Sequence, residues 1–297
     1  MDDSRYIVGK SVKDEPTIQQ PQGAGVFPKV PFRLLLTGPS ASGKTNLGRW
    51  MLNRFYIREN GKSWFDRIYL LSPTGNIDHV WKDLDGLKPK DRITAPTPEL
   101  LDKIFNDQKR EILGSTNDEA ASHMSLDSLS RRKTRAKRIL IIFDDAIAEK
   151  IMTSNSFLKL FIAGRHYNIS SLVLTQSYVK IMRSARIQAS AVCMFPSKTS
   201  EIARLYAEHG PKELNKNEFT ELVQYATSPT DSEPYPFFYV DVFAPVKTRF
   251  RRGFTNVLEL HDGNQQVENR HEEEKSNGMN VNKRKRKAEH PPTRDED

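Results

Sequence analysis

Cysteine is almost absent from this 297-residue chain, whose single cysteine is Cys193. An internal disulfide framework is therefore excluded, and the composition suits a reducing compartment. Long apolar runs are missing too, because none approaches the roughly 18 residues that a membrane crossing needs. The opening MDDSRYIVGK lacks the basic and then apolar pattern of a secretory signal. We therefore expect an intracellular protein with no membrane partner.

Positive charge is what the chain has in excess: the formal net charge is +8 at pH 7, which favours polyanionic partners. Residues 265–297 contain eight Lys or Arg and eight Asp or Glu, so the excess belongs to the first 264 residues. Hydrophobic residues make up 37% of the chain, enough to bury a sizeable core. A basic folded body is what a protein that moves nucleic acid needs.

Short apolar runs alternate with stretches of helical spacing, which predicts an α/β domain with a mainly parallel central sheet flanked by helices. The runs are FRLLLT (32–37), RIYLLS (67–72), RILIIF (138–143), SLVLT (171–175), AVCMF (191–195) and PFFYVDVF (236–243). Helical spacing occurs at 46–57, 157–167 and 201–210. Cys193 is expected to be a buried strand residue.

Polar segments set the expected boundaries of this domain, which we assign to residues 29–261. Residues 1–28 are expected to be a flexible leader, and residues 262–297 a disordered charged tail. Residues 114–137 are rich in serine and weakly apolar, so a surface insertion is expected there.

Residues 38–45, GPSASGKT, match the pattern G-x-x-x-x-G-K-[ST] between an apolar strand and a helix. The pattern predicts a phosphate-binding loop for a nucleoside triphosphate, expected to be ATP. Lys44 would neutralise the β- and γ-phosphates, and the Thr45 hydroxyl would bind Mg²⁺. The residues expected to contact the nucleotide are Gly38, Pro39, Ser40, Ala41, Ser42, Gly43, Lys44, Thr45 and Asn46.

Two carboxylates, Asp144 and Asp145, directly follow the apolar run RILIIF. A buried parallel strand delivers such residues to the edge of the sheet where α/β proteins bind ligands. Asp144 is predicted to hold Mg²⁺, and Asp145 to orient or deprotonate the attacking water. The alternative is that one of the two aspartates caps the next helix.

The next apolar run, SLVLT, ends in Thr175 and Gln176. Gln176 can reach a γ-phosphate or the attacking water if its strand lies between the phosphate-loop strand and the acidic strand. That order is typical of motor-type ATPases, whereas GTPases and small-molecule kinases have the acidic strand beside the phosphate loop. A capping or turn glutamine is the alternative.

Together, GPSASGKT, IIFDDA and GRHYNISSLVLTQSY resemble the FtsK–HerA superfamily. The closer resemblance is to the genome-packaging ATPases of poxviruses, other large DNA viruses, virophages and Maverick/Polinton elements, over about residues 30–245. It implies a RecA-like core in a ring of identical subunits, a hexamer or pentamer. It also implies ATP hydrolysis at subunit boundaries and translocation of double-stranded DNA into a capsid, with capsid proteins as partners.

The same resemblance implies roles for individual residues. Lys44 and Thr45 become the phosphate-loop pair, Asp144 the magnesium acid and Gln176 the sensor of the γ-phosphate. Asp145 stands where many relatives carry Glu. Arg165 matches the arginine that reaches a neighbouring subunit's nucleotide, with Arg186 as second choice. Either arginine can instead be a surface or phosphate-contacting residue.

Two short stretches are strongly basic. RRKTRAKR (131–138) either contacts DNA phosphates without reading sequence or is a solvated loop. KRKRK (283–287) is typical of a nuclear-localisation signal or a nonspecific DNA tether. The host nucleus is therefore one expected location, and a cytoplasmic virus factory or the virion are the others.

Two other classes of function share the phosphate loop. A nucleotide or small-molecule kinase would need an acceptor pocket and usually an arginine-bearing lid, and the sequence indicates neither. A nucleotide-gated DNA-binding scaffold with little turnover is the other class. Intact Lys44, Asp144 and Gln176 argue against it.

Overall fold

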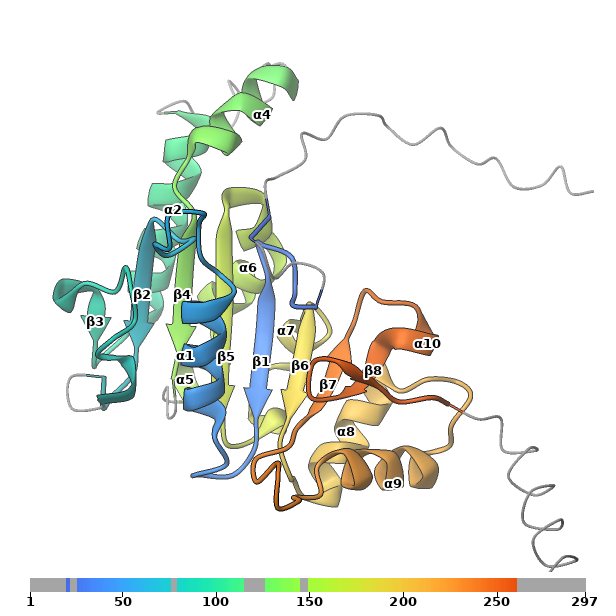
Figure 1. Ribbon diagram of the computed structural model, residues 1–297. Helices are drawn as coiled ribbons and strands as arrows, with labels where there is room; N and C mark the ends of the chain where they lie inside the picture. The colour runs from blue at the N-terminus through green and yellow to red at the C-terminus, as the bar shows by residue number, and fades with distance from the viewer. Residues whose placement is uncertain (1–19, 22–25, 76–78, 115–125, 145–148, 261–297) are drawn as a thin grey trace, which may run out of the picture.

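The computed structural model describes residues 20–21, 26–75, 79–114, 126–144 and 149–260. These residues form a sheet of nine strands with helices on both faces (Figure 1). The strands are β1 (Arg33–Thr37), β2 (Arg67–Leu71), β3 (Arg92–Ile93), β4 (Ile139–Phe143), β5 (Ile169–Thr175), β6 (Ala191–Met194), β7 (Phe238–Asp241), β8 (Phe250–Arg252) and β9 (Asn256–Val257).

The helices follow the strands along the chain. The α-helices are α1 (Lys44–Arg54), α2 (Pro98–Leu113), α4 (Leu126–Arg135), α5 (Glu149–Met152), α6 (Asn155–Ala163), α7 (Arg183–Arg186), α8 (Thr199–His209), α9 (Lys216–Ala226) and α10 (Val246–Arg249). The short 3₁₀ helices are η1 (His79–Trp81), η2 (Pro89–Asp91), η3 (Gly164–Tyr167) and η4 (Tyr178–Lys180). Among the described helices, none combines the length and apolar character that a membrane crossing requires.

The strand order is β3-β2-β4-β5-β1-β6-β7-β8-β9. Strands β3 to β6 in this order pair in parallel, and β7, β8 and β9 extend the sheet with antiparallel pairs. All six predicted apolar runs contain a strand, and Cys193 is buried in β6. The predicted α/β fold with a mainly parallel sheet is therefore confirmed.

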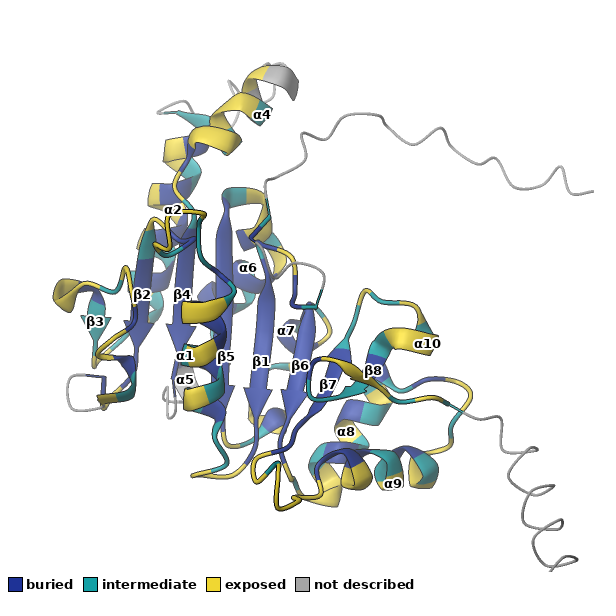
Figure 2. Cartoon of the chain, viewed as in Figure 1, coloured by how far each residue is buried: buried dark blue, intermediate teal, exposed yellow. Residues whose placement is uncertain are grey.

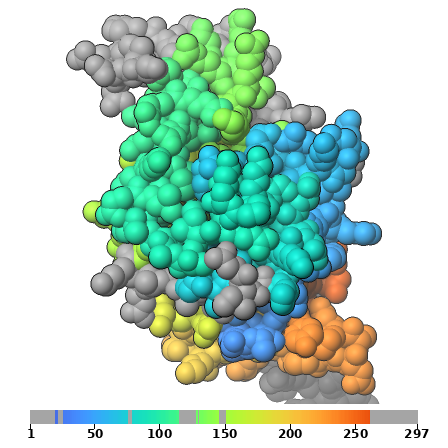
Figure 3. Space-filling model, turned by 90° about the vertical axis from the view of Figure 1, so that its left-hand side faces the viewer, coloured from blue at the N-terminus to red at the C-terminus, as the bar shows by residue number. Residues whose placement is uncertain are grey.

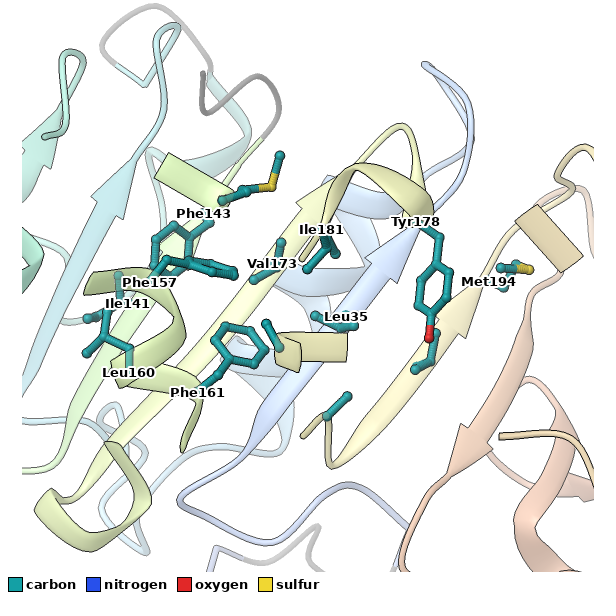
Figure 4. Close-up of a cluster of buried hydrophobic side chains, with 14 of the residues drawn as sticks. Leu35, Ile141, Phe143, Phe157, Leu160, Phe161, Val173, Tyr178, Ile181 and Met194 are labelled. Carbon is teal, nitrogen blue, oxygen red and sulfur yellow. The ribbon is translucent and has the colours of Figure 1, made fainter. Parts of the chain in front are cut away.

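Both faces of the central strands, β2, β4, β5, β1 and β6, are buried, which is why these strands are mainly apolar (Figure 2). In β1, Leu35 packs on one face, while Leu34 and Leu36 pack on the other. Helices α2, α6, α7, α8 and α9 cover the first face, and α1 covers the second. Figure 4 shows side chains of α6 beside Ile141 and Val173. Each fully buried leucine contributes about 1.5–3 kcal/mol, so this packing fixes the strand ends that carry the motifs.

Helix α2 was not predicted, although its sequence carries the signals of a helix. The hydroxyl of Thr97 accepts a hydrogen bond from the N–H of Leu100, and Pro98 occupies the first turn. Leu101 and Ile104 are buried on one side at helical spacing.

The structure describes part of the expected leader and part of the expected insertion, but none of the expected tail. Phe27 belongs to the expected leader, yet it is 6% exposed and its ring centroid lies 4.1 Å from that of Phe55. The packed part of the chain therefore begins before residue 29. In the expected insertion, residues 126–135 form α4, which stands out from the body (Figure 3). The tail at 262–297, including KRKRK, lies outside the described residues.

Candidate active site

The loop predicted to bind phosphate joins β1 to α1 at the edge of the sheet where the parallel strands end (Figure 1). A Cβ on Gly38 would lie only 2.5 Å from the Cβ of Phe195, so the loop can pass there only as glycine. Gly43 has a φ of 94° and Ala41 a φ of 60°, both left-handed. These conformations turn successive backbone N–H groups toward one point at the start of α1, which suits an anion.

Lys44 and Thr45 open α1 and lie beside the end of β4. Lys44 is 4% exposed, and its ammonium group donates a hydrogen bond to the carbonyl oxygen of Pro39 at 2.7 Å. The Thr45 hydroxyl lies 3.5 Å from Oδ1 of Asp144, the residue that follows β4. Hydroxyl and carboxylate oxygens are the hard ligands that Mg²⁺ prefers, so the residues present fit the predicted metal.

Asp144 is held by a residue that the sequence analysis missed. The indole N–H of Trp81 donates to Oδ2 of Asp144, and the N–H of Asp144 donates to the carbonyl of Leu71 at 3.0 Å. Trp81 is fully buried in η1, where Arg92 donates to its carbonyl at 3.2 Å. One carboxylate oxygen therefore faces the tryptophan and the other faces Thr45. No motif signals this contact, because the two residues are 63 positions apart.

Gln176 lies at the same edge of the sheet. Strand β5 lies between β1 and β4, so the condition set for Gln176 by the sequence is met. Thr37 pairs with Thr175, which puts the first residue after β1 beside Gln176, and Gln176 is exposed. The same edge thus carries the phosphate loop, Asp144 and Gln176. Asp145 lies outside the described residues, so its predicted role stays a prediction.

Arg186 lies in a buried ion pair, which argues against its predicted second-choice role at a neighbouring subunit. Its Nε is 2.9 Å from Oε2 of Glu208, and the two side chains are 5% and 1% exposed. The Tyr178 hydroxyl donates to the same oxygen at 2.8 Å. Burial alone raises the pKa of Glu208, but hydrogen bonds from Arg186 and Tyr178 hold that pKa below its usual value. A side chain enclosed in this way holds α7 and the segment after β5 to α8.

Arg165, by contrast, is exposed in η3, which precedes β5. It therefore lies at the amino edge of the sheet, opposite the phosphate loop. Strand β5 has seven residues. At ~3.3 Å per residue, about 20 Å separates its two ends. The structure does not bring Arg165 to the predicted nucleotide site of its own chain.

A basic cavity surrounds Arg165. Its volume is about 590 Å³, and its lining includes Lys29, Arg33, Lys133 and Asp241. Arg33 is 4% exposed, and its Nε has no acceptor among the described residues. Burial, and then the positive charge of Arg165, lowers the pKa of Arg33 to about 10. Of the charged side chains that line this cavity, four are positive and one, Asp241, is negative, so the cavity suits an anion.

The basic stretch 131–138 divides into two parts. Lys137 and Arg138 are taken up by ion pairs, with Glu111 at 3.3 Å and Asp66 at 3.3 Å. Two other members of the stretch, Arg132 and Arg135, are exposed on α4. Only the α4 part of the stretch therefore presents exposed arginines to a partner.

Comparison with known proteins finds similarity to proteins of viruses. The family model described as Poxvirus A32 protein matches residues 26–224. The DNA packaging proteins OPG160 of Variola virus and of Vaccinia virus (strain Western Reserve) are each 25% identical over 179 residues, covering 58% of this chain and 56% of theirs. The chain spans about half the length of the curated relatives it matches. Among solved structures, the genome packaging NTPase B204 from Sulfolobus turreted icosahedral virus 2, in complex with ATP-gammaS, is 12% identical with a TM-score of 0.47, over 76% of this chain and 98% of that one.

Proposed function

The chain belongs to the poxvirus A32 protein family, and on that premise we propose that it is a Mg²⁺-dependent ATPase that drives double-stranded DNA into a viral or virus-like capsid. The resemblance to poxvirus proteins that the motifs indicated is thus confirmed. One observation carries the proposal: the Thr45 hydroxyl contacts the Asp144 carboxylate next to the glycine-containing phosphate loop, and Lys44 lies in the same place.

In the proposed reaction, the backbone of the phosphate loop and the ammonium group of Lys44 hold the β- and γ-phosphates. Thr45 and Asp144 would hold Mg²⁺, which neutralises charge on the transferred phosphoryl group. Gln176 orients the attacking water from the neighbouring strand end, and Asp145 accepts its proton. Support for hydrolysis over small-molecule phosphorylation comes from the strand order, in which β5 separates β1 from β4.

We propose double-stranded DNA as the substrate that is moved, because relatives of this chain are named DNA packaging proteins. We propose α4 as the surface that contacts DNA, because Arg132 and Arg135 are exposed on it. Neutralisation of DNA phosphates by Lys and Arg dominates binding that does not depend on the DNA sequence.

A ring of subunits follows from the same proposal. Arg165 lies about one strand length from the phosphate loop of its own chain, so it would act on a neighbour's nucleotide. The basic cavity that it shares with Arg33 and Lys133 would then receive the phosphates of the adjoining subunit. Capsid proteins are the further partners that a packaging role requires.

The test is ATP hydrolysis by the purified protein with and without double-stranded DNA, together with its oligomeric mass with and without ATP. We expect DNA to raise turnover and ATP to favour a ring.

Lys44→Ala is expected to lower turnover by 100-fold or more, since it removes charge stabilisation of the transferred group, an effect of at least ~2.7 kcal/mol. Lys212→Ala, which removes an exposed lysine elsewhere, is the matched control.

A separate variant tests the contact with DNA. Charge reversal of Arg132 and Arg135 together is expected to abolish stimulation by DNA while basal turnover stays unchanged. Full turnover by Lys44→Ala would refute the site. A flat response to DNA in the unaltered protein would favour the scaffold, and transfer of phosphate to a small acceptor would favour the kinase.

A further inference from the structure

A tyrosine that no motif signals lies beside the phosphate loop. Tyr235 belongs to the connection between α9 and β7, and a Cβ built on Gly43 would lie 3.5 Å from the Cβ of Tyr235 and 3.7 Å from a ring carbon. Figure 3 shows orange atoms of this part of the chain against blue atoms of the N-terminal part at the lower end of the molecule. The ring therefore borders the glycine that immediately precedes Lys44.

The connection that carries Tyr235 is held in place from both ends. Arg252 of β8 forms an ion pair with Glu233 at 2.9 Å and donates to the carbonyls of Tyr225 at 3.0 Å and Ser228 at 2.9 Å. On the other side of Tyr235, Phe237 is 7% exposed, and its ring centroid lies 5.5 Å from that of Phe195, which contacts Gly38. The connection is thus tied to the sheet and to the floor of the phosphate loop.

Two prolines restrict the backbone around the tyrosine. Pro234 precedes Tyr235 and Pro236 follows it. Each proline has a fixed φ, and a residue before proline is confined to extended conformations. The ring is therefore presented with little backbone freedom left to lose when a ligand binds.

Core packing does not account for this side chain, because Tyr235 is 62% exposed. A large aromatic ring held rigidly, and left open to solvent next to an anion-binding loop, offers a flat apolar face to a planar group. The planar part of a nucleoside triphosphate is its base. We propose that Tyr235 stacks on the base of the nucleotide whose phosphates the loop holds, an inference that rests on the proposed nucleotide site.

In this arrangement, different residues bind the two parts of the ligand. The phosphates depend on Lys44 and the loop, and the base depends on the face of the Tyr235 ring. Base–aromatic stacking tolerates different bases, because every base has a π-face. The phenol hydroxyl is not needed for stacking, so a phenylalanine ring serves equally well.

The experiment compares the binding of Mg·ATP and of Mg²⁺ with inorganic tripolyphosphate by calorimetry. Tyr235→Ala is expected to weaken ATP binding roughly 5- to 150-fold, the range for loss of one stacked base, and to leave tripolyphosphate binding unchanged. Tyr235→Phe should bind ATP as the unaltered protein does. Tyr225→Ala is the matched control, because Tyr225 is a tyrosine of similar exposure, 64%, at the end of α9.

The outcomes separate this inference from the function on which it rests. Unchanged ATP binding by Tyr235→Ala overturns the stacking, and so does an equal loss of ATP and tripolyphosphate, which would mean a disturbed phosphate loop. Lys44→Ala is expected to weaken both ligands. If Lys44→Ala weakens neither, the nucleotide site itself is wrong, whatever Tyr235 does.

Discussion

A single hydrogen bond sets the orientation of the acid predicted to hold magnesium. The Trp81 indole N–H occupies Oδ2 of Asp144, and this leaves Oδ1 toward the Thr45 hydroxyl at 3.5 Å. Ligands of a metal are commonly oriented by such outer contacts, whose loss weakens metal affinity about 10- to 100-fold. Trp81 is therefore a positioning residue in the proposed site.

Trp81→Phe is expected to raise the Mg²⁺ concentration needed for half-maximal binding of a fluorescent ATP analogue by about tenfold, the lower end of that range, because phenylalanine keeps apolar contacts but cannot donate. Trp64→Phe is the matched control, since Trp64 is also buried and its indole nitrogen has no acceptor among the described residues. An equal Mg²⁺ midpoint in the two variants would rule out the positioning role.

At this scale the sequence could predict Lys44, Thr45 and Asp144, because their chemistry follows from a contiguous pattern and a strand end. It could not predict Trp81, which reaches Asp144 only through tertiary packing. The ion pair of Arg186 with Glu208 was equally beyond the sequence, because nothing in a local pattern shows whether an arginine is exposed or buried against a carboxylate.

Among the elements, α8 is joined to the segment that follows Gln176. Glu201 of α8 accepts hydrogen bonds from the Ser177 hydroxyl at 2.7 Å and the Val179 N–H at 3.0 Å. Glu208, further along the same helix, accepts hydrogen bonds from Tyr178 and Arg186. The strand end that carries the predicted sensor therefore keeps its place through carboxylates of one helix.

Arg186→Met is expected to lower the free energy of unfolding by about 3–5 kcal/mol, because it leaves the carboxylate of Glu208 buried without its partner. Guanidinium denaturation followed by circular dichroism measures the change. Arg186→Met combined with Glu208→Leu should recover part of the loss, since no charge is then left unpaired. If the double variant is as unstable as the sum of the two single variants, the two side chains do not act as a pair.

Strands and helices were predictable where burial requires several apolar residues in a recognisable pattern. Strands β1, β4 and β5 are buried on both faces, and each contains an apolar run, of which ILIIF in β4 is unbroken. Strands β3 and β9 have two residues each, too few for any pattern, and their pairing depends on the neighbours that hold them. The antiparallel direction of β7 is set by how the chain returns after α9, which no local run of residues encodes.

In the molecule as a whole, two sites that carry positive side chains lie at opposite edges of one sheet. The carboxyl edge carries the phosphate loop and Asp144, and the amino edge carries the basic cavity with Arg165. The rigid, fully buried strand between them fixes their separation. One chain cannot join the two, whereas in the proposed ring of identical chains, assembled head to tail, each interface would pair one edge with the other.

Mixing two inactive variants tests that arrangement. Lys44→Ala subunits keep Arg165, and Arg165→Ala subunits keep the phosphate loop, so either protein alone is expected to lose most DNA-stimulated hydrolysis. In an equal mixture that assembles at random, about a quarter of the interfaces would pair an intact loop with an intact arginine, because each of the two conditions holds independently half of the time at a heterologous interface. Turnover should return to roughly that fraction of the unaltered protein's. Arg204→Ala, at an exposed arginine of α8, should keep full activity by itself. Mixtures that stay inactive at every ratio would mean that Arg165 does not act across the interface.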